Sequence, residues 1–174
     1  MQNKEVYDEL VSKFEAKYGE KPQAVAYAPG RIEVLGNHTD YNEGYVFSAA
    51  IDKGTFFAVS PTADATCSLT AGDLMETAEF TTAAVAPAKE MTWQNYVTGT
   101  FNWLFDGNPA AAPHGWKGMF LGNIPLGAGL SSSAALEMCT ALALSKIYGI
   151  EKDKTTLAKI GQKAEHMHGK TGRG

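Results

Sequence analysis

The chain has 174 residues, of which 44% are hydrophobic and 20% are charged, and its formal net charge is −4. This composition is that of an ordinary globular domain, and nothing in it requires two complete domains. The negative charge argues against a broad nucleic-acid surface, and no apolar run is long enough for a membrane span or for the core of a signal sequence. We therefore expect a cytoplasmic protein whose partners are small molecules, with no nucleic acid and no membrane among them.

The first half of the chain shows one helical pattern followed by several strand patterns. Apolar residues recur at the spacing of one helix face, which predicts a helix over residues 5–18 that ends at Gly19. Pro29 and Gly30 are expected to interrupt the first strand, and Ile51 and Asp52 to join two others. We expect an antiparallel meander of strands over residues 24–28, 31–35, 45–50, 53–60, 65–70 and 77–80.

Polar residues gather around the second of these strands. Alternation places Arg31 and Glu33 on one face, which is compatible with a solvated edge as well as with a site. The loop that follows contains Asn37, His38, Thr39 and Asp40, whose donors and acceptors suit a polyhydroxylated ligand. Recognition of a sugar would use all of them.

The second half of the chain is mainly helical. Aromatic residues three and four apart predict a helix from Trp93 to Leu104, and these rings fit core packing better than ligand stacking, although Trp93 would also suit an adenine ring. Residues 116–121 read as a strand, and an apolar helix follows the serines and ends at Gly149. A last helix is predicted over residues 154–168, with a threonine pair available for capping. Cys67 and Cys139 are expected to be reduced core residues.

A glycine- and serine-rich loop connects that strand to the apolar helix. Its residues are Gly127, Ala128, Gly129, Leu130, Ser131, Ser132 and Ser133. Glycines let backbone N–H groups turn toward an anion, and free N–H groups at a helix start favour negative charge, so the pattern indicates a phosphate cradle. Close helix–strand packing is the alternative. The loop matches neither the Walker pattern nor the dinucleotide fingerprint.

Phosphoryl transfer would need a metal and a cation near the loop. A serine hydroxyl at the helix start and a carboxylate from another helix, such as Glu165, would suit Mg²⁺, although a lone glutamate is also compatible with a solvated charge. Arg31 suits the task of stabilising the transferring charge. No obvious base is present to orient an attacking hydroxyl.

Four segments together resemble the galactokinases of the GHMP kinase superfamily. They are residues 29–42, residues 93–97, residues 125–135 and the Ala164-Glu165-His166 segment. The segments follow one another in the right order, and the similarity covers almost the whole chain. The resemblance implies an α/β domain of the α+β type: the GHMP kinase N-terminal, ribosomal protein S5 domain 2-like fold. This domain has a mixed, mainly antiparallel sheet with helices packed on it.

The resemblance also implies ATP- and Mg²⁺-dependent phosphorylation of galactose at its anomeric hydroxyl. By position, Arg31 matches the transition-state arginine, and His38, Thr39 and Asp40 match the sugar-binding loop. Residues 127–133 match the ATP-phosphate loop, Ser133 and Glu165 fall where the family holds Mg²⁺, and Trp93 matches an aromatic residue at the adenine pocket.

Two departures from the family pattern stand out. The family usually has Asn where this chain has Glu33, and Glu where it has Asn37; our hypothesis is that Glu33 supplies the lost acceptor. The family's catalytic aspartate is expected about three residues beyond Gly174. The family's C-terminal domain is also expected to follow this part of the sequence. We therefore expect residues 1–174 to form a truncated N-terminal domain with little or no kinase activity.

Several alternatives stay open at this point. One is a non-catalytic galactose and ATP sensor, and another is a kinase of the same fold that acts on a different sugar, which Asn37 suggests. We also expect the chain to self-associate through apolar surface that the C-terminal domain would normally cover.

Overall fold

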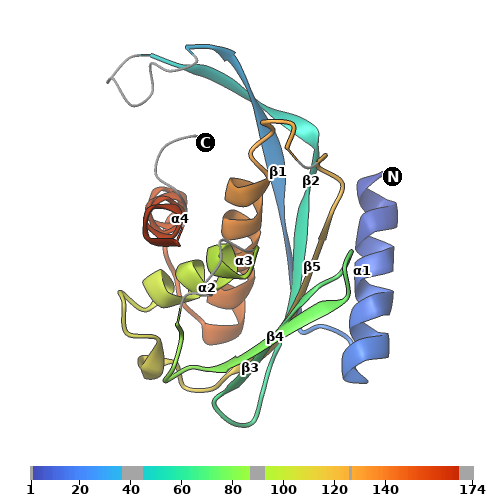
Figure 1. The fold of residues 1–174 in the computed structure, drawn as a ribbon, viewed down its shortest axis with the longest axis vertical. Helices are drawn as coiled ribbons and strands as arrows, with labels where there is room; N and C mark the ends of the chain where they lie inside the picture. Colours follow the sequence, from blue (N-terminus) through green and yellow to red (C-terminus); the bar gives the residue numbers. More distant parts are fainter. Residues whose placement is uncertain (1, 37–44, 87–92, 126, 169–174) are drawn as a thin grey trace.

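The computed structural model describes residues 2–36, 45–86, 93–125 and 127–168, and the side chains of these residues up to Glu165 (Figure 1). In the described part of the chain, no helix is both long enough and apolar enough to cross a membrane. The elements in chain order are α1 (Asn3–Tyr18), β1 (Ala24–Leu35), β2 (Phe47–Pro61), β3 (Thr66–Ala71), β4 (Glu76–Thr81), α2 (Trp93–Leu104), the short 3₁₀ helix η2 (Pro109–Ala111), β5 (Trp116–Gly122), α3 (Ser132–Tyr148) and α4 (Lys154–His168).

The five strands form one sheet in the order β1-β2-β5-β3-β4. Neighbouring strands are antiparallel except β3 and β5, which are parallel. The prediction of a mixed, mainly antiparallel sheet is confirmed, whereas the predicted antiparallel meander is wrong. The reason is that β5, which comes last in the sequence, pairs with both β2 and β3 and separates the two hairpins.

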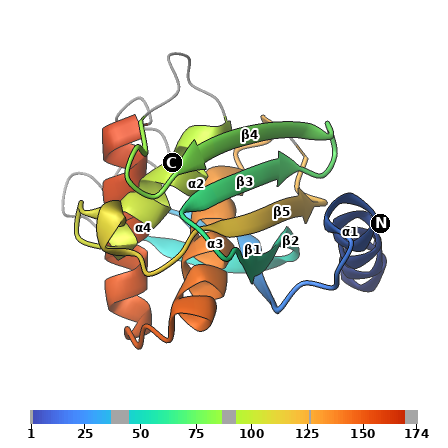
Figure 2. The same cartoon turned by 90° about the horizontal axis from the view of Figure 1, so that it is seen from below.

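Helices cover both faces of the sheet (Figures 1 and 2). One apolar cluster joins α1 to one face through Leu10, Phe14 and Met119. The larger cluster lies on the other face, where α2, α3 and α4 pack, and it contains Phe57 and Trp116. Because successive strand residues point to opposite faces, Trp116 and Met119 of the same strand serve different clusters. The sequence of β5 is therefore apolar on both faces.

Strands β1 and β2 are each continuous, contrary to the expected breaks at residues 29–30 and 51–52. The β1–β2 ladder shifts register between Pro29 and Arg31, whose partners in β2 are Gly54 and Ala50. The extra residues therefore lie in β2, at positions 51–53 opposite Gly30, and both strands continue past this irregularity. Both strands extend beyond the rest of the sheet as an arm (Figure 1). Large apolar side chains on this arm are exposed, among them Val34, Leu35 and Phe47.

Local signals fix the helix ends. A capping box between Gln2 and Glu5 begins α1, which ends at Gly19, and α3 ends at Gly149 with a left-handed φ of 64°. The start of α4 differs from the expectation: the cap is the Asp153 carboxylate, which accepts hydrogen bonds from the Thr156 amide and hydroxyl. An ionised carboxylate is a stronger acceptor for the first-turn amides than a threonine hydroxyl.

Both cysteines are free and buried, as predicted. Burial raises the pKa of Cys67 to about 12 and also raises the pKa of Cys139. The thiolate form, which reacts and binds metals, is therefore disfavoured at both positions.

Candidate active site

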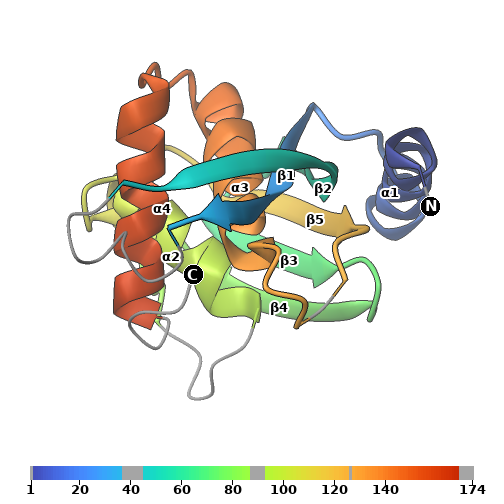
Figure 3. The same cartoon turned by 90° about the horizontal axis from the view of Figure 1, so that it is seen from above.

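Residues 127–131 lie directly before α3 (Figure 3), and three of them have a left-handed backbone conformation, which suits the predicted anion cradle. Gly127 and Gly129 have φ values of 69° and 67°, and Ser131 also lies in the left-handed region at 58°. Helix α3 begins directly afterwards, and its first backbone hydrogen bond runs from the Ala135 amide to the Ser131 carbonyl at 3.0 Å. The amides of the intervening first turn have no carbonyl four residues earlier within the helix. They are therefore suited to an anion.

The two side chains predicted to hold Mg²⁺ lie side by side. Ser133 is in the first turn of α3, and its hydroxyl donates a hydrogen bond of 3.2 Å to Oε1 of Glu165 on α4. Glu165 is half-buried, so the alternative of a fully solvated charge does not describe it. A hydroxyl and a carboxylate next to a phosphate-type loop form the hard-oxygen donor set that Mg²⁺ prefers, and these residues fit the ion.

A second acid lies behind this pair and was missed by the sequence analysis. Glu137 is 1% exposed, and its Oε1 has no hydrogen-bond partner among the described residues. Burial, and next the charge of Glu165, raise the pKa of Glu137 to about 9. On α2, the pKa of Tyr96 is also raised, first by burial and then by Glu165 and Glu137. Glu137 stands four residues after Ser133, and this spacing places both side chains on one helix face. The spacing is the sequence pattern from which Glu137 could have been predicted.

Arg31 and Glu33 lie on the same side of β1, as the alternation predicts. Nε of Arg31 is buried, is 3.6 Å from Oε2 of Glu33, and forms no hydrogen bond within the described ranges. Both carboxylate oxygens of Glu33 accept from the Ser48 hydroxyl on β2, at 2.9 and 3.0 Å. A buried guanidinium N–H without an acceptor is costly, and an anionic ligand would relieve that cost.

The main chain joins Arg31 to the cradle. The Arg31 amide donates a hydrogen bond of 3.0 Å to the carbonyl of Leu130, which is two residues before α3 begins. The strand predicted to serve the sugar and the loop predicted to serve the phosphates therefore meet at one backbone contact.

The remaining predicted site residues are Trp93 and the residues of the sugar-binding loop. Asn37, His38, Thr39 and Asp40 lie outside the described residues. The Trp93 ring packs against Phe120 at a centroid distance of 5.4 Å, and its Nε1 donates to Glu76 at 3.4 Å. The ring also lines a cavity of about 310 Å³ with Glu76, Thr77, Ala78 and Gln94. Its assignment to adenine stays a prediction.

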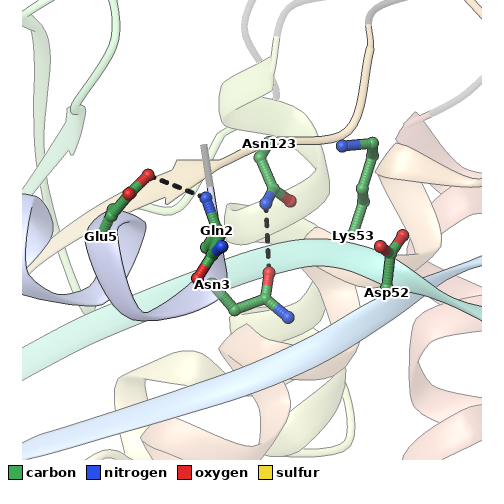
Figure 4. Close-up of a pocket in the computed structure, with 6 residues that line it drawn as sticks. All are labelled: Gln2, Asn3, Glu5, Asp52, Lys53 and Asn123. Carbon is green, nitrogen blue, oxygen red and sulfur yellow. Dashed lines mark hydrogen bonds between the residues drawn. The ribbon is translucent and has the colours of Figure 1, made fainter.

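A larger cavity of about 660 Å³ lies at the start of α1 and is lined by Gln2, Asn3, Glu5, Asp52, Lys53 and Asn123 (Figure 4). Asn123 accepts from the Gly54 amide at 2.8 Å and donates to Asn3 at 3.1 Å, and Asn3 donates to Tyr27 at 3.1 Å. These bonds tie the end of β5 to α1 and β2. The role of Asn123 could not be predicted from any local pattern, because its partners are far away in the chain.

Known proteins resemble this chain in sequence and in fold. Residues 95–174 match the family model described as "GHMP kinases N terminal domain", and residues 12–61 match the "Galactokinase galactose-binding signature". Galactokinases of Lactobacillus helveticus and Bacillus subtilis are 37% and 36% identical to the chain and match 91% of it. The chain belongs to the galactokinase family and matches the N-terminal portion of its members.

Solved structures agree with this assignment. A Lactococcus lactis galactokinase complexed with galactose superposes with a TM-score of 0.84 at 32% identity, over 97% of this chain and 44% of that one. The Methanococcus jannaschii mevalonate kinase, at 21% identity and a TM-score of 0.68 over 82% of this chain and 45% of that one, shares the fold. The chain spans 42% and 41% of the length of the two curated relatives.

The buried acid predicts a pH-dependent stability. Because the pKa of Glu137 is raised to about 9 in the folded chain from an ordinary 4.5, the folded state keeps a proton that the unfolded state releases between these values. Stability should therefore fall as the pH rises through this window. Glu137→Gln removes the titration, and the variant should gain stability over the parent, on the order of 3 kcal/mol by pH 7 and little at pH 4.

Urea unfolding of both chains across this range measures the difference. The groups that face Glu137 from neighbouring helices, Glu165 and Tyr96, are the same in both proteins. The matched control is Glu151→Gln, at an exposed position outside the helices. Parallel stability profiles for the parent and Glu137→Gln would contradict the prediction.

Proposed function

We propose that this chain binds galactose and ATP and takes part in the phosphorylation of galactose at its anomeric hydroxyl. The observation that carries the proposal is the contact of β1 with the cradle, because the Arg31 amide bonds to Leu130. Phosphoryl transfer requires the acceptor sugar and the terminal phosphate to lie in line. The backbone hydrogen bond keeps the two predicted ligand segments next to each other, which supports such an arrangement. The galactose in the Lactococcus lactis structure supports the choice of sugar.

Each proposed residue has a physical task. Residues 127–133 would hold the phosphates with backbone amides, Trp93 would contact the adenine ring, and Arg31 would stabilise charge on the transferring group. Ser133 and Glu165 would hold Mg²⁺, which neutralises phosphate charge when bound. Asn37, His38, Thr39 and Asp40, with Glu33, would bind the sugar hydroxyls. A catalytic aspartate beyond Gly174, a C-terminal domain and a cytoplasmic location stay predictions.

The metal pair can be tested without measuring catalysis. Glu165→Gln keeps the size of the side chain but removes the charge that would attract Mg²⁺. The affinity of the chain for ATP in the presence of Mg²⁺ should fall about tenfold or more, which corresponds to about 1.4 kcal/mol. Its affinity for ATP in EDTA should change little. Isothermal titration calorimetry under both conditions measures the two values.

The control for this test is Glu151→Gln, which removes an equal charge from an exposed position outside the helices. It should leave both affinities as in the parent. An equal loss with Mg²⁺ and with EDTA for Glu165→Gln would mean that this carboxylate does not serve the metal.

Glu33, which stands where the family usually has Asn, allows the proposed binding of galactose to be tested. Glu33→Gln replaces a carboxylate by an amide, and a carboxylate is the stronger acceptor for sugar hydroxyls. We expect the dissociation constant for galactose to rise several-fold, about fivefold or more. Equilibrium binding with Glu79→Gln, an exposed strand glutamate on β4, provides the matched control. An unchanged constant for Glu33→Gln would refute the idea that Glu33 is the acceptor.

We also propose self-association through the arm of β1 and β2, because Leu35 and Phe47 are paired there and are 69% and 62% exposed. Adjacent exposed apolar side chains favour association. Sedimentation velocity should show an average mass that rises with concentration and a smaller rise for Leu35→Ser/Phe47→Ser. Leu142→Ser, at an exposed position on α3, should behave like the parent. A strictly monomeric parent would contradict the proposal.

A further inference from the structure

Gly30 of β1 stands opposite the extra residues of β2 and lies against the cradle more closely than any side chain would permit. A Cβ atom added at this position would come 2.8 Å from the carbonyl oxygen of Leu130. Contacts this short do not occur for a real Cβ, so one of the two backbone segments would have to move. The reason for glycine here is the close approach of two main chains, not an unusual backbone angle.

The other two neighbours of Gly30 are side chains, which can move aside more easily than the main chain. The Cδ1 atoms of Ile51 and Ile124 would each lie 3.1 Å from the added Cβ. These are ends of flexible side chains and can adjust, whereas the Leu130 carbonyl is main chain. The same oxygen accepts the Arg31 amide hydrogen bond. A substitution at position 30 would therefore act first on this bond.

The helix beyond the cradle cannot follow such a movement easily. The first half of α3 contributes Ala135, Leu136 and Cys139 to the larger core cluster. Shifting a packed helix costs core contacts, whereas the exposed glycines 127 and 129 can turn at little cost. The displacement would be concentrated in residues 127–131.

We propose that Gly30 is a positioning residue that holds residues 127–131 against β1 and so sets the spacing between Arg31 and the phosphate cradle. This proposal rests on the proposed function, because the spacing matters only if the cradle holds the phosphates of a nucleotide next to Arg31. The contact itself is a property of the free chain and can be measured without a ligand.

The sheet contains a matched control. A Cβ added at Gly72 would also come 2.8 Å from a main-chain carbonyl, that of Phe120, and this carbonyl likewise accepts a backbone hydrogen bond, from the Gly72 amide at 2.8 Å. Gly72 follows β3, and its own carbonyl accepts from Lys13 of α1. Gly72→Ala therefore introduces the same kind of overlap away from the cradle.

The experiment compares Gly30→Ala and Gly72→Ala with the parent by amide hydrogen exchange in the ligand-free chain. Gly30→Ala should increase exchange about tenfold or more at the Arg31 amide, because its 3.0 Å bond to the Leu130 carbonyl is broken. Gly72→Ala should leave the exchange of this amide within about twofold of the parent. Thermal unfolding of both variants checks that their losses of stability are similar.

Nucleotide binding supplies the second measurement. The affinity for ATP with Mg²⁺ should fall about tenfold in Gly30→Ala, and by less than about twofold in Gly72→Ala. If Gly30→Ala does not fold, the triple variant Gly30→Ala/Ile51→Val/Ile124→Val removes both Cδ1 atoms and leaves only the overlap with Leu130. Its control is Ile51→Val/Ile124→Val.

The two measurements separate the proposals. Equal exchange of the Arg31 amide in Gly30→Ala and Gly72→Ala would overturn the role of Gly30, whatever the affinity for ATP. Faster exchange in Gly30→Ala alone supports it. If the parent chain bound no ATP while this exchange difference was present, the proposed function would fail and the positioning contact would stand.

Discussion

The burial of α3 is the constraint on which the rest of the structure depends. This helix packs against β1 and β2 on one side and against α2 and α4 on the other, and Leu144 and Cys139 are fully buried. A helix enclosed in this way has a fixed axis, so its first turn points in a fixed direction. The amides of that turn, the Ser133 hydroxyl and the preceding glycine loop take their orientation from the core.

The same enclosure sets the electrostatics of the site. Ser133 and Glu137 extend from one face of α3, and Glu165 approaches from α4, so two carboxyl groups lie near the inner end of the cradle. Two like charges in a region of low dielectric are unfavourable, and the deeper acid keeps its proton. A neutral Glu137 limits the cost of burying two carboxyl groups near each other.

Much of this arrangement could be read from the sequence because it depends on local signals. Periodic apolar residues and glycine stops define the helices, and the glycine–serine run before an apolar helix marks the cradle. The pairing of Ser133 with Glu165 was predicted from the resemblance to galactokinases rather than from spacing. The roles of Glu137, Asn123 and Gly30 depend on contacts between segments distant in the chain, which no local pattern contains.

The errors have the same origin. Pro29 and Gly30 are turn formers, yet a long ladder with β2 keeps β1 extended, and the irregularity appears as extra residues of β2 opposite Gly30. The order of the strands could not be predicted from the sequence either. The alternation of apolar and polar residues indicates which residues face the core, but it contains no information on which strands are neighbours. The parallel pairing of β3 with β5 is a tertiary choice of this kind.

The central position of β5 has a consequence for how the chain folds. The hairpins β1–β2 and β3–β4 are close in sequence and can form early, but each lacks its neighbour until Trp116–Gly122 lies between them. Such non-local pairing closes long loops and slows folding. During synthesis both hairpins leave the ribosome with an open edge, so the interval before β5 emerges is the period of greatest exposure to aggregation.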